Sequence, residues 1–325
     1  HTSPFFPSLP TTNFEKYNGE CSLEEIERVS KIVRKLGNDH IIGIGGGKIL
    51  DLAKAVGNEC SLSVILVPTL PSTCAAWTPL SVIYSSKGEY ISFSIHRKST
   101  LAVFLEPRIL LSSPSEYLKA GIGDTLAKWY EADAITRQEN FLPVPVQAAL
   151  ESARLCKGNL LEVGHSALLD HENNQLTKKL IQVFETIIVL GGMVGGFGDR
   201  FGRIAGAHSI HNGITQLPNM HHILHGEKVA YGILVQLMLE NQSAEISTLL
   251  PHYKKWNLPY NLDSLGIKKN NLHTSIKTIA EFATLPNESI HLIRSEINAN
   301  IIVEAILSLE NLVNENFTNY SWYSS

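Results

Sequence analysis

A strand, a glycine turn and a helix follow one another in the stretch HIIGIGGGKILDLAKAVG, which covers residues 40–57. Residues 41–44 form an apolar run of strand length, and helical periodicity begins after the glycines. Because Gly45, Gly46 and Gly47 carry no Cβ, backbone N–H groups can approach an anion there, and the first turn of the helix adds its dipole. The unit predicts an α/β domain with a phosphate cradle. The alternative is a tight turn without a ligand, since the spacing matches neither the GxGxxG nor the GxxxxGK fingerprint.

The segments on either side of this unit also fit an α/β domain. Residues 22–36 predict a helix, with Ser22 and Glu25 as its capping box and Gly37 at its end. Residues 64–67 predict a second buried strand, and the stretches ISFSIH and LAVFLEP predict further strand.

A loop rich in Pro, Ser and Thr follows the second strand. In an open α/β sheet, ligands bind beyond the carboxyl ends of the strands. We therefore expect the hydroxyl groups of this loop near whatever the glycine turn binds, although the same residue types are common in ordinary turns. These residues are Thr69, Ser72, Thr73 and Thr78.

The sequence pattern becomes helical from about Ser113. This change predicts an α/β domain over residues 1–112 and an all-helical domain over residues 113–325. In the second domain, the stretch AGIGDTLAKWYEADAI predicts a helix that begins near Asp124, with Lys128 one turn later on the same face. An aspartate in a first turn is ordinarily a cap, which is the alternative to a role as a ligand.

Five of the thirteen histidines lie in residues 202–232, with the sequence GRIAGAHSIHNGITQLPNMHHILHGEKVAYG. A helix ending at Gly213 would place His208 and His211 one turn apart, and a second helix would begin near His225. An aspartate and two histidines on rigid helices suit a divalent metal with an open position for substrate. Structural roles for these histidines are an equal alternative, because spacing across distant segments does not identify a ligand set. Two more histidines lie in the connection, and we assign no chemistry to them: His221 and His222.

Several motifs, in this order, resemble the iron-type, metal-dependent alcohol dehydrogenases, and in particular their glycerol dehydrogenase branch. They are GIGGGK with Asp51 after it, VPT before the Ser/Thr loop, AGIGD, AHSIHNG and HGEKVAYG, and together they extend over essentially the whole chain. Within that branch, STCAAWTPLSV, GIGDTLAKWYEA, GGMVGGFGDRFGRIAGAH and KVAYGILVQ are most similar to hydroxycarboxylate dehydrogenases, which reduce 2-oxo acids with NADPH. The resemblance implies a dehydroquinate-synthase-like fold, in which a nucleotide-binding α/β domain and an all-helical domain enclose a cleft.

The resemblance also implies the residues of the site. Asp124, His208 and His225 would hold one divalent metal, which could be zinc, iron, nickel or manganese. His211 would be the catalytic residue beside the metal, near the substrate or its proton path. The cofactor would be NAD or NADP, with NADPH favoured. The residues implied to bind it are Gly45, Gly46, Gly47, Lys48, Asp51, Thr69, Ser72, Thr78, Leu80 and Tyr84.

The sequence departs from the glycerol dehydrogenase pattern at three places. Ile49 replaces a threonine, which removes a hydroxyl group near the phosphates. Cys74 replaces the aspartate that contacts glycerol in that branch, which argues against a polyol substrate. The first strand of the nucleotide-binding domain is expected before His1, so we expect the α/β domain to be incomplete at its start. The residue that distinguishes NAD from NADP is also expected there, so the sequence does not decide between the two cofactors.

The sequence therefore predicts an oxidoreductase that interconverts 2-oxo acids and 2-hydroxy acids by hydride transfer. Lys128, Arg200 and Arg203 would attract a substrate carboxylate, and Cys74 would avoid repelling it. The alternative is that these three cations are structural or solvated. Glycerol dehydrogenase is the second candidate activity, and a dehydroquinate-synthase-type lyase is the third. A shortened relative that binds metal but no cofactor is a candidate from another class.

Charge and cysteine content limit the partners and the compartment. A net charge of −4 gives no electrostatic case for nucleic acid or an anionic membrane. The longest apolar stretches, such as SVILVP and TIIVLGGMVGG, are too short or too rich in glycine to span a bilayer, and we expect no secretory signal. Four cysteines without CxxC spacing indicate reduced thiols in a cytoplasmic protein. The expected partners are a small-molecule substrate and further copies of this chain in a homo-oligomer.

Overall fold

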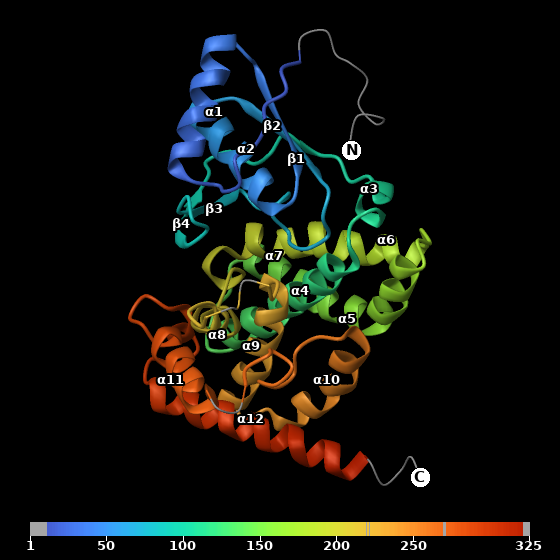
Figure 1. Ribbon diagram of the computed structural model, residues 1–325, viewed down its shortest axis with the longest axis vertical. Helices are drawn as coiled ribbons and strands as arrows, with labels where there is room; N and C mark the ends of the chain where they lie inside the picture. The colour runs from blue at the N-terminus through green and yellow to red at the C-terminus, as the bar shows by residue number, and fades with distance from the viewer. Residues whose placement is uncertain (1–11, 219, 221, 269–270, 321–325) are drawn as a thin grey trace.

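The structure is a computed structural model that describes residues 12–218, 220, 222–268 and 271–320. Figure 1 shows an α/β part formed by the N-terminal residues and a helical part formed by the rest of the chain. The predicted fold class is confirmed, whereas the boundary between residues 112 and 113 stays a prediction. The expected N-terminal loop lies outside the described residues up to residue 11, and residues 12–18 have no regular secondary structure.

The α/β part contains a parallel sheet and a separate antiparallel strand pair. Within the described residues, the parallel sheet has the order β1-β2-β5, and β3 pairs with β4. The elements of this part are, in chain order, α1 (Leu23–Leu36), β1 (His40–Gly45), α2 (Gly47–Cys60), β2 (Ser63–Pro68), β3 (Leu80–Tyr84), β4 (Tyr90–Ile95), β5 (Ala102–Val103) and α3 (Pro107–Leu111).

The predicted strand, glycine turn and helix are confirmed. Strand β1 ends at Gly45, and Gly46 is the extended N-cap residue from which α2 begins. Strand β2 lies beside β1 in parallel, so the loop that follows β2 begins at the same edge of the sheet as the glycine turn. The backbone N–H of Thr69 donates to the carbonyl of Gly45, which joins the two segments directly.

Helix α1 begins and ends where the sequence predicted. The Ser22 hydroxyl accepts a hydrogen bond from the backbone N–H of Glu25, and Gly37 is the C-cap. Only this half of the capping box forms, because the Glu25 carboxylate binds Asn18 and Arg28 instead.

A buried ion pair fastens α2 to the loop after β2. Lys54 Nζ lies 2.8 Å from Asp51 Oδ1, and both residues are buried. The ammonium also donates hydrogen bonds to the backbone carbonyls of Ala75, Thr78 and Leu80. The end of the Ser/Thr loop is thereby held against α2.

His96 is a buried neutral imidazole in the same part of the molecule. Its Nε2 lies 2.7 Å from the Ser81 hydroxyl, and its Nδ1 is buried without a hydrogen-bond partner among the described residues. Protonation would add an unpaired N–H at Nδ1. Burial, together with the positive charge of Lys54, lowers the pKa of His96 to about 4.

Replacing His96 with glutamine is expected to flatten the acid dependence of stability. An unfolded histidine titrates near pH 6.5. Between about pH 6.5 and pH 4 the unfolded chain therefore binds a proton that the folded chain does not, and stability falls by about 3 kcal/mol as the pH falls. The comparison is the urea midpoint of the metal-free protein and the variant at about pH 7 and about pH 4.5. An equal loss of stability in both proteins would contradict the assignment.

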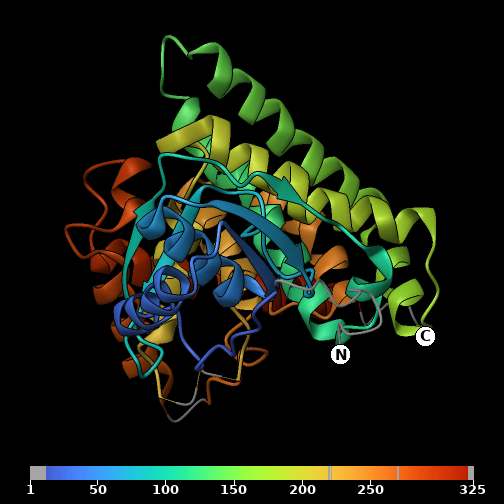
Figure 2. The same cartoon turned by 90° about the horizontal axis from the view of Figure 1, so that it is seen from above.

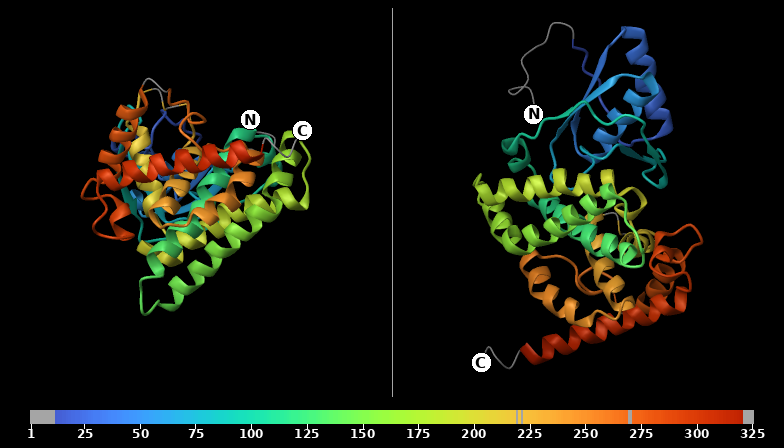
Figure 3. Two further views of the ribbon diagram at one scale, coloured as in Figure 1. Left: turned by 90° about the horizontal axis from the view of Figure 1, so that it is seen from below. Right: turned by 180° about the vertical axis from the view of Figure 1, so that it is seen from behind.

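The second part of the chain is a helical array. Within the described residues its elements are, in chain order, α4 (Ser115–Thr136), α5 (Val144–Glu172), α6 (Lys178–Glu185), the π-helical turn Thr186–Leu190, α7 (Gly191–Gly198), the 3₁₀ turn Asp199–Phe201, α8 (Gly206–Thr215), α9 (His225–Leu239), α10 (Ser243–Trp256), α11 (Leu272–Ala283), the 3₁₀ turn Ser289–Leu292 and α12 (Ala299–Tyr320). Viewed from above, α5 passes along one side of the α/β part (Figure 2). Figure 3 shows α12 crossing the end of the array that is farthest from the α/β part.

Helix α9 lies at the centre of the helical part. It packs against α4, α8, α10 and α12, and nearly all of its residues are buried. The buried hydroxyl of Tyr253 in α10 donates to the carbonyl of Ala230 in α9. A helix that is buried on every side fixes the position of any side chain at its ends.

The run from Lys178 to Phe201 is, by length and composition, apolar enough to cross a membrane. Its helices α6 and α7 pack against α5, and just over half of its most apolar window is buried inside the protein. Burial of this kind is typical of a core helix of a folded domain.

Three predicted boundaries were wrong. Helix α4 begins at Ser115 rather than near Asp124, because Gly121 and Gly123 lie inside the helix at close contacts with other segments. Helix α8 continues to Thr215 rather than ending at Gly213. Most of the expected strand in LAVFLEP is absent, and β5 consists of Ala102–Val103.

Candidate functional site

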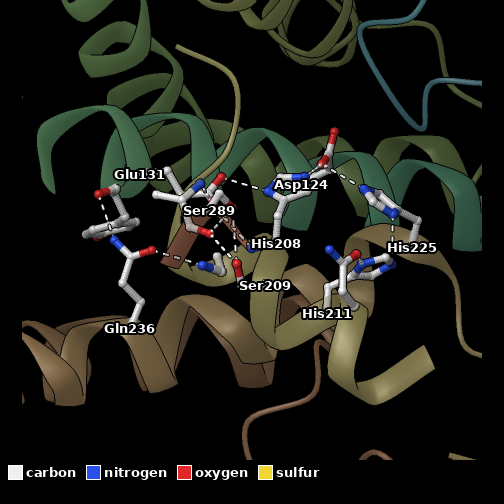
Figure 4. Close-up of polar contacts among 12 residues, drawn as sticks. Asp124, Glu131, His208, Ser209, His211, His225, Gln236 and Ser289 are labelled. Carbon is white, nitrogen blue, oxygen red and sulfur yellow. Dashed lines mark hydrogen bonds and ion pairs between the residues drawn. The ribbon is translucent and has the colours of Figure 1, made fainter. Parts of the chain in front are cut away.

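The three predicted metal ligands lie together, although they come from different helices. Asp124 is in the middle of α4, His208 is in the first turn of α8, and His225 is the first residue of α9. Asp124 Oδ1 lies 3.5 Å from His208 Nε2 and 3.4 Å from His225 Nε2 (Figure 4). One ligand atom from each residue lies within 4.8 Å of the others. The cluster is thus close enough for one ion to contact all three side chains.

The chemistry of the cluster fits a divalent metal. Asp124 Oδ1 is buried and has no hydrogen-bond partner among the described residues, which is costly for a carboxylate oxygen unless a cation faces it. Two imidazole nitrogens and one carboxylate form a donor set that suits zinc, iron or nickel and leaves a position open for substrate. His225 is 44% exposed on its side chain, whereas Asp124 and His208 are buried, so the cluster opens to solvent on the His225 side.

Glycines at the helix crossings bring these ligands together. A Cβ on Gly226 would lie 1.8 Å from the carbonyl oxygen of Ala120, and a Cβ on Gly123 would lie 2.4 Å from the carbonyl oxygen of Gly226. The backbones of α4 and α9 are therefore in direct contact beside Asp124 and His225. Gly232 has the same function where α9 meets α8, since its Cβ would lie 2.3 Å from the carbonyl oxygen of Ala207.

Glu131 holds His208, the second predicted ligand, in place. Its Oε2 lies 2.7 Å from His208 Nδ1, and its Oε1 accepts hydrogen bonds from the backbone N–H groups of Ala205 and His208 at the start of α8. A carboxylate on Nδ1 leaves Nε2 as the metal-facing nitrogen. Burial alone would lower the pKa of His208, but Glu131 and Asp124 raise it to about 9.

Sequence reasoning missed Glu131 as part of the site. The signal was present in the helical spacing, because Asp124, Lys128 and Glu131 follow at i, i+4 and i+7 and so share one face of α4. Gln236 was also missed, and its side-chain oxygen accepts from the N–H of Ala207. The backbone N–H groups that bind Glu131 and Gln236 are distant in sequence, so these contacts could be identified only from the structure.

Replacing Glu131 with glutamine is expected to weaken metal binding about 10–100-fold. The amide nitrogen would face His208 Nδ1 as a second donor, so the carboxylate that orients the imidazole would be lost. Competition with a zinc chelator measures this affinity. The exposed Glu185→Gln variant is the control, and equal zinc affinity in the Glu131→Gln protein would contradict the proposed role.

His211 lies beside the cluster and contacts one of its members directly. Its Nε2 lies 2.9 Å from His225 Nδ1, on the opposite side of that ring from Asp124 (Figure 4). Burial and the neighbouring imidazoles hold the pKa of His211 well below its usual range. His222, to which no chemistry was assigned, is exposed, and His221 lies outside the described residues.

Lys128 is a buried lysine with no ion-pair or hydrogen-bond partner among the described residues. It is 8% exposed and lies one helical turn after Asp124 on α4. Burial alone would lower the pKa of Lys128, but the carboxylates of Asp124 and Glu131 raise it above its usual range. The side chain is therefore an ammonium ion close to the metal cluster.

The loop after β2 reaches the helical part at Cys74 and Trp77. A Cβ on Gly191 would lie 3.4 Å from Cys74 Cβ, and one on Gly192 would lie 2.3 Å from Trp77 Cβ. The Thr78 hydroxyl donates to the carbonyl of Cys74. The predicted cofactor loop and the predicted substrate residue Cys74 thus lie against α7 and near Lys128.

The glycine turn has a helix N-terminus without a side-chain cap. No side chain accepts a hydrogen bond from the first turn of α2 at its N-cap, Gly46, which leaves that turn open to an anion. Two of the side chains predicted to bind cofactor have protein partners instead. The Lys48 ammonium pairs with Glu20 and lies 5.0 Å from the centre of the Tyr84 ring, and the Asp51 carboxylate pairs with Lys54.

The remaining predicted residues lie around these groups. Ser72 is part of the loop after β2, and Leu80 and Tyr84 are the two ends of β3. Arg203 forms an ion pair with Asp199, and Arg200 stacks over Phe201 with 4.6 Å between its guanidinium carbon and the ring centre. The contact residues of both arginines, Asp199 and Phe201, thus lie within the same five-residue segment as the arginines themselves.

Known proteins resemble this chain over most of its length. The profile of the family described as "Iron-containing alcohol dehydrogenase" matches residues 8–107. "Hydroxycarboxylate dehydrogenase A" of Escherichia coli (strain K12) is 43% identical over 285 residues, which cover 87% of this chain and 78% of that protein. "Glycerol dehydrogenase" of Pseudomonas putida is 37% identical over 300 residues, which cover 91% of this chain and 81% of that protein.

A solved structure shows the same fold. A probable glycerol dehydrogenase from Sinorhizobium meliloti 1021 has 32% sequence identity and a TM-score of 0.85, and the match covers 93% of this chain and 85% of that chain. The family predicted from the sequence motifs is confirmed by these similarities. The chain is an oxidoreductase that belongs to the iron-containing alcohol dehydrogenase family.

Proposed function

We propose that this protein is a metal-dependent, NAD(P)-linked dehydrogenase that interconverts 2-oxo acids and 2-hydroxy acids. Three features support the proposal: the cluster of Asp124, His208 and His225, the open N-terminus of α2 next to the Ser/Thr loop, and the buried cation of Lys128. The single observation that carries the choice of substrate is Lys128. It is an ammonium ion without a partner among the described residues, close to the carboxylate that would bind the metal.

The roles of the residues follow from their chemistry. Asp124, His208 and His225 would hold the metal, and the predicted cofactor residues around the glycine turn would hold the dinucleotide. A divalent metal supplies a Lewis acid that polarises a carbonyl oxygen, and a reduced nicotinamide supplies the hydride. Glu131 keeps His208 in orientation, and His211 contacts His225. We retain His211 as the candidate for the proton path, which it would reach through His225.

A substrate carboxylate would supply the missing partner of Lys128. Charge-assisted hydrogen bonds contribute about 1.5–3 kcal/mol, and a buried position strengthens them. Cys74, which lies near Lys128, stands where the resemblance places an aspartate, so no carboxylate at this position repels an acid. Arg203 is the secondary cation, with Asp199 as its partner in this structure.

Glycerol dehydrogenase is the second candidate activity. It is supported by similar proteins of that name, such as that of Pseudomonas putida. Against it, the position of Cys74 lacks the aspartate that the sequence resemblance associates with glycerol. We therefore place the acid first and the polyol second.

Replacing Lys128 with methionine is expected to raise KM for 2-oxobutyrate about 10–100-fold, since one charge-assisted contact is lost. KM for the uncharged substrate dihydroxyacetone should change by less than about threefold, because no carboxylate is involved. Steady-state kinetics of the metal-reconstituted protein with NADPH and NADH provide both values. Methionine fills nearly the same volume, so packing is largely retained.

The exposed Lys178→Met variant is the control for this measurement. A wild-type kcat/KM for glycerol or dihydroxyacetone equal to or above that for 2-oxo acids would contradict the acid assignment and favour glycerol dehydrogenase. A KM increase of equal size for both substrate classes would show that Lys128 acts through packing.

Cofactor binding is tested independently of turnover. NADPH and NADH fluorescence is titrated against the protein, alongside its metal content. A protein that binds metal but neither nucleotide would support the alternative that this chain is a shortened relative without cofactor. Cytoplasmic location and a homo-oligomeric state stay predictions.

A further inference from the structure

A chain of hydrogen bonds leads away from the proposed metal ligand His225. His225 Nδ1 lies 2.9 Å from His211 Nε2, and His211 Nδ1 lies 3.0 Å from Asn212 Oδ1. The amide nitrogen of Asn212 lies 3.2 Å and 3.0 Å from the two carboxylate oxygens of Glu288. Glu288 comes just before the 3₁₀ turn Ser289–Leu292, far from α8 and α9 in sequence.

The carboxylate at the end of the chain determines every donor along it. Both carboxylate oxygens of Glu288 lie within hydrogen-bond distance of the amide nitrogen of Asn212 and accept from it, which turns the amide oxygen toward His211. That oxygen only accepts, so His211 carries its proton on Nδ1. His211 Nε2 is then a bare acceptor, and the proton of His225 must be on Nδ1. The lone pair of His225 is therefore on Nε2, the nitrogen that faces Asp124.

We propose that Glu288 and Asn212 are positioning residues that fix the tautomers of His211 and His225 and so prepare His225 Nε2 to bind a metal. This inference rests on the proposed metal-binding function. The chain performs for His225 the task that the carboxylate of Glu131 performs for His208. It differs in one respect, because a neutral amide and a neutral imidazole separate Glu288 from the ligand.

The two histidines differ in exposure, which accounts for the two ways in which their rings are oriented. His208 is buried and contacts Glu131 directly, whereas His225 is 44% exposed on its side chain. On the exposed side, water would compete with the His225 ring for a directly bonded carboxylate. A relay through two neutral groups orients the imidazole from a half-buried anchor instead.

The first test measures tautomers and needs no metal. In protein labelled with ¹⁵N only in histidine, the ring nitrogen shifts of His211 and His225 report which nitrogen carries the proton. The metal-free wild type is expected to show Nδ1–H on both rings, and Glu288→Leu is expected to show a mixture on His211. An Nε2–H tautomer on His211 in the wild type would overturn the proposal.

The second test measures zinc affinity by chelator competition. Glu288→Leu is expected to bind zinc about tenfold more weakly than wild type. Glu288→Gln should stay within about threefold, because its amide oxygen still accepts from Asn212. Glu281→Leu, an exposed carboxylate on α11, is the matched control and should bind like wild type. Melting temperatures of the metal-free variants separate a folding defect from a loss of orientation.

The outcomes separate this inference from the proposed function. Tight zinc binding by wild type with no difference between Glu288→Leu and Glu281→Leu would overturn the positioning role alone. A wild type that binds no zinc at Asp124, His208 and His225 would overturn the metal-binding function and this inference with it. A tenfold loss in Glu288→Leu, restored in Glu288→Gln, supports the proposal.

Discussion

Replacing Gly226 with alanine is expected to separate two helices and to abolish tight metal binding. The new Cβ would lie 1.8 Å from the carbonyl oxygen of Ala120 and 2.6 Å from its carbon. Both are backbone atoms that cannot rotate away, so α4 and α9 must move apart. Overpacking of this kind costs about 3 kcal/mol or more, which corresponds to a fall of roughly 5–10 °C in apparent Tm.

The same movement would displace the proposed metal ligands. Asp124 follows Gly123 on α4, and His225 precedes Gly226 on α9, so both ligands lie next to the crossing. Zinc affinity by chelator competition and thermal unfolding of the metal-free protein measure the two effects separately. Gly158→Ala in α5 is the matched control, because a Cβ there meets no atom within 4 Å. That control should gain about 0.5–1 kcal/mol from its lower unfolded-state entropy. Wild-type zinc affinity in Gly226→Ala would contradict the account of the crossing.

Replacing Asp124 with asparagine is expected to lower kcat/KM about 10³-fold. The change removes the negative charge of the proposed ligand set while keeping the size of the side chain. A Lewis-acid metal supplies several kcal/mol of transition-state stabilisation, and about 4 kcal/mol corresponds to that factor. The metal content of the purified variant should fall together with its activity, since a neutral amide oxygen is a weaker ligand.

Asp133→Asn is the control for this substitution. Asp133 is on the same helix, but its carboxylate pairs with Arg137 and takes no part in the cluster. Its activity and metal content should match those of wild type. If Asp124→Asn keeps its metal and more than about a tenth of the wild-type kcat/KM, Asp124 is not a ligand that catalysis requires.

The cluster of candidate ligands could be predicted because each of them lies in a local motif of the family resemblance. AGIGD, AHSIHNG and HGEKVAYG each carry one candidate ligand, and the structure brings Asp124, His208 and His225 close together. Glu131, Asn212 and Glu288 were missed because their importance arises from partners that are distant in sequence. Asn212 follows His211 directly, yet its amide nitrogen donates to a residue 76 positions later.

The helix boundaries failed for a related physical reason. Gly121 and Gly123 have low helix propensity, which predicts that the helix begins after them. In the structure they are interior positions of α4, and they approach the carbonyl oxygens of Pro71 and Gly226 so closely that neither position has room for a Cβ. Tertiary packing therefore outweighs the local preference. Similarly, the predicted cofactor residues Lys48 and Asp51 have partners, Glu20 and Lys54, that no local pattern revealed.

The most direct test of the central claim is a crystal structure of the zinc-loaded protein with anomalous diffraction measured at the zinc edge. One anomalous peak is expected among Asp124, His208 and His225, about 2.0–2.2 Å from Asp124 Oδ1 and from Nε2 of each histidine. A protein that reduces 2-oxo acids with NADPH or NADH but shows no peak at this cluster, or a peak only elsewhere, would contradict this claim.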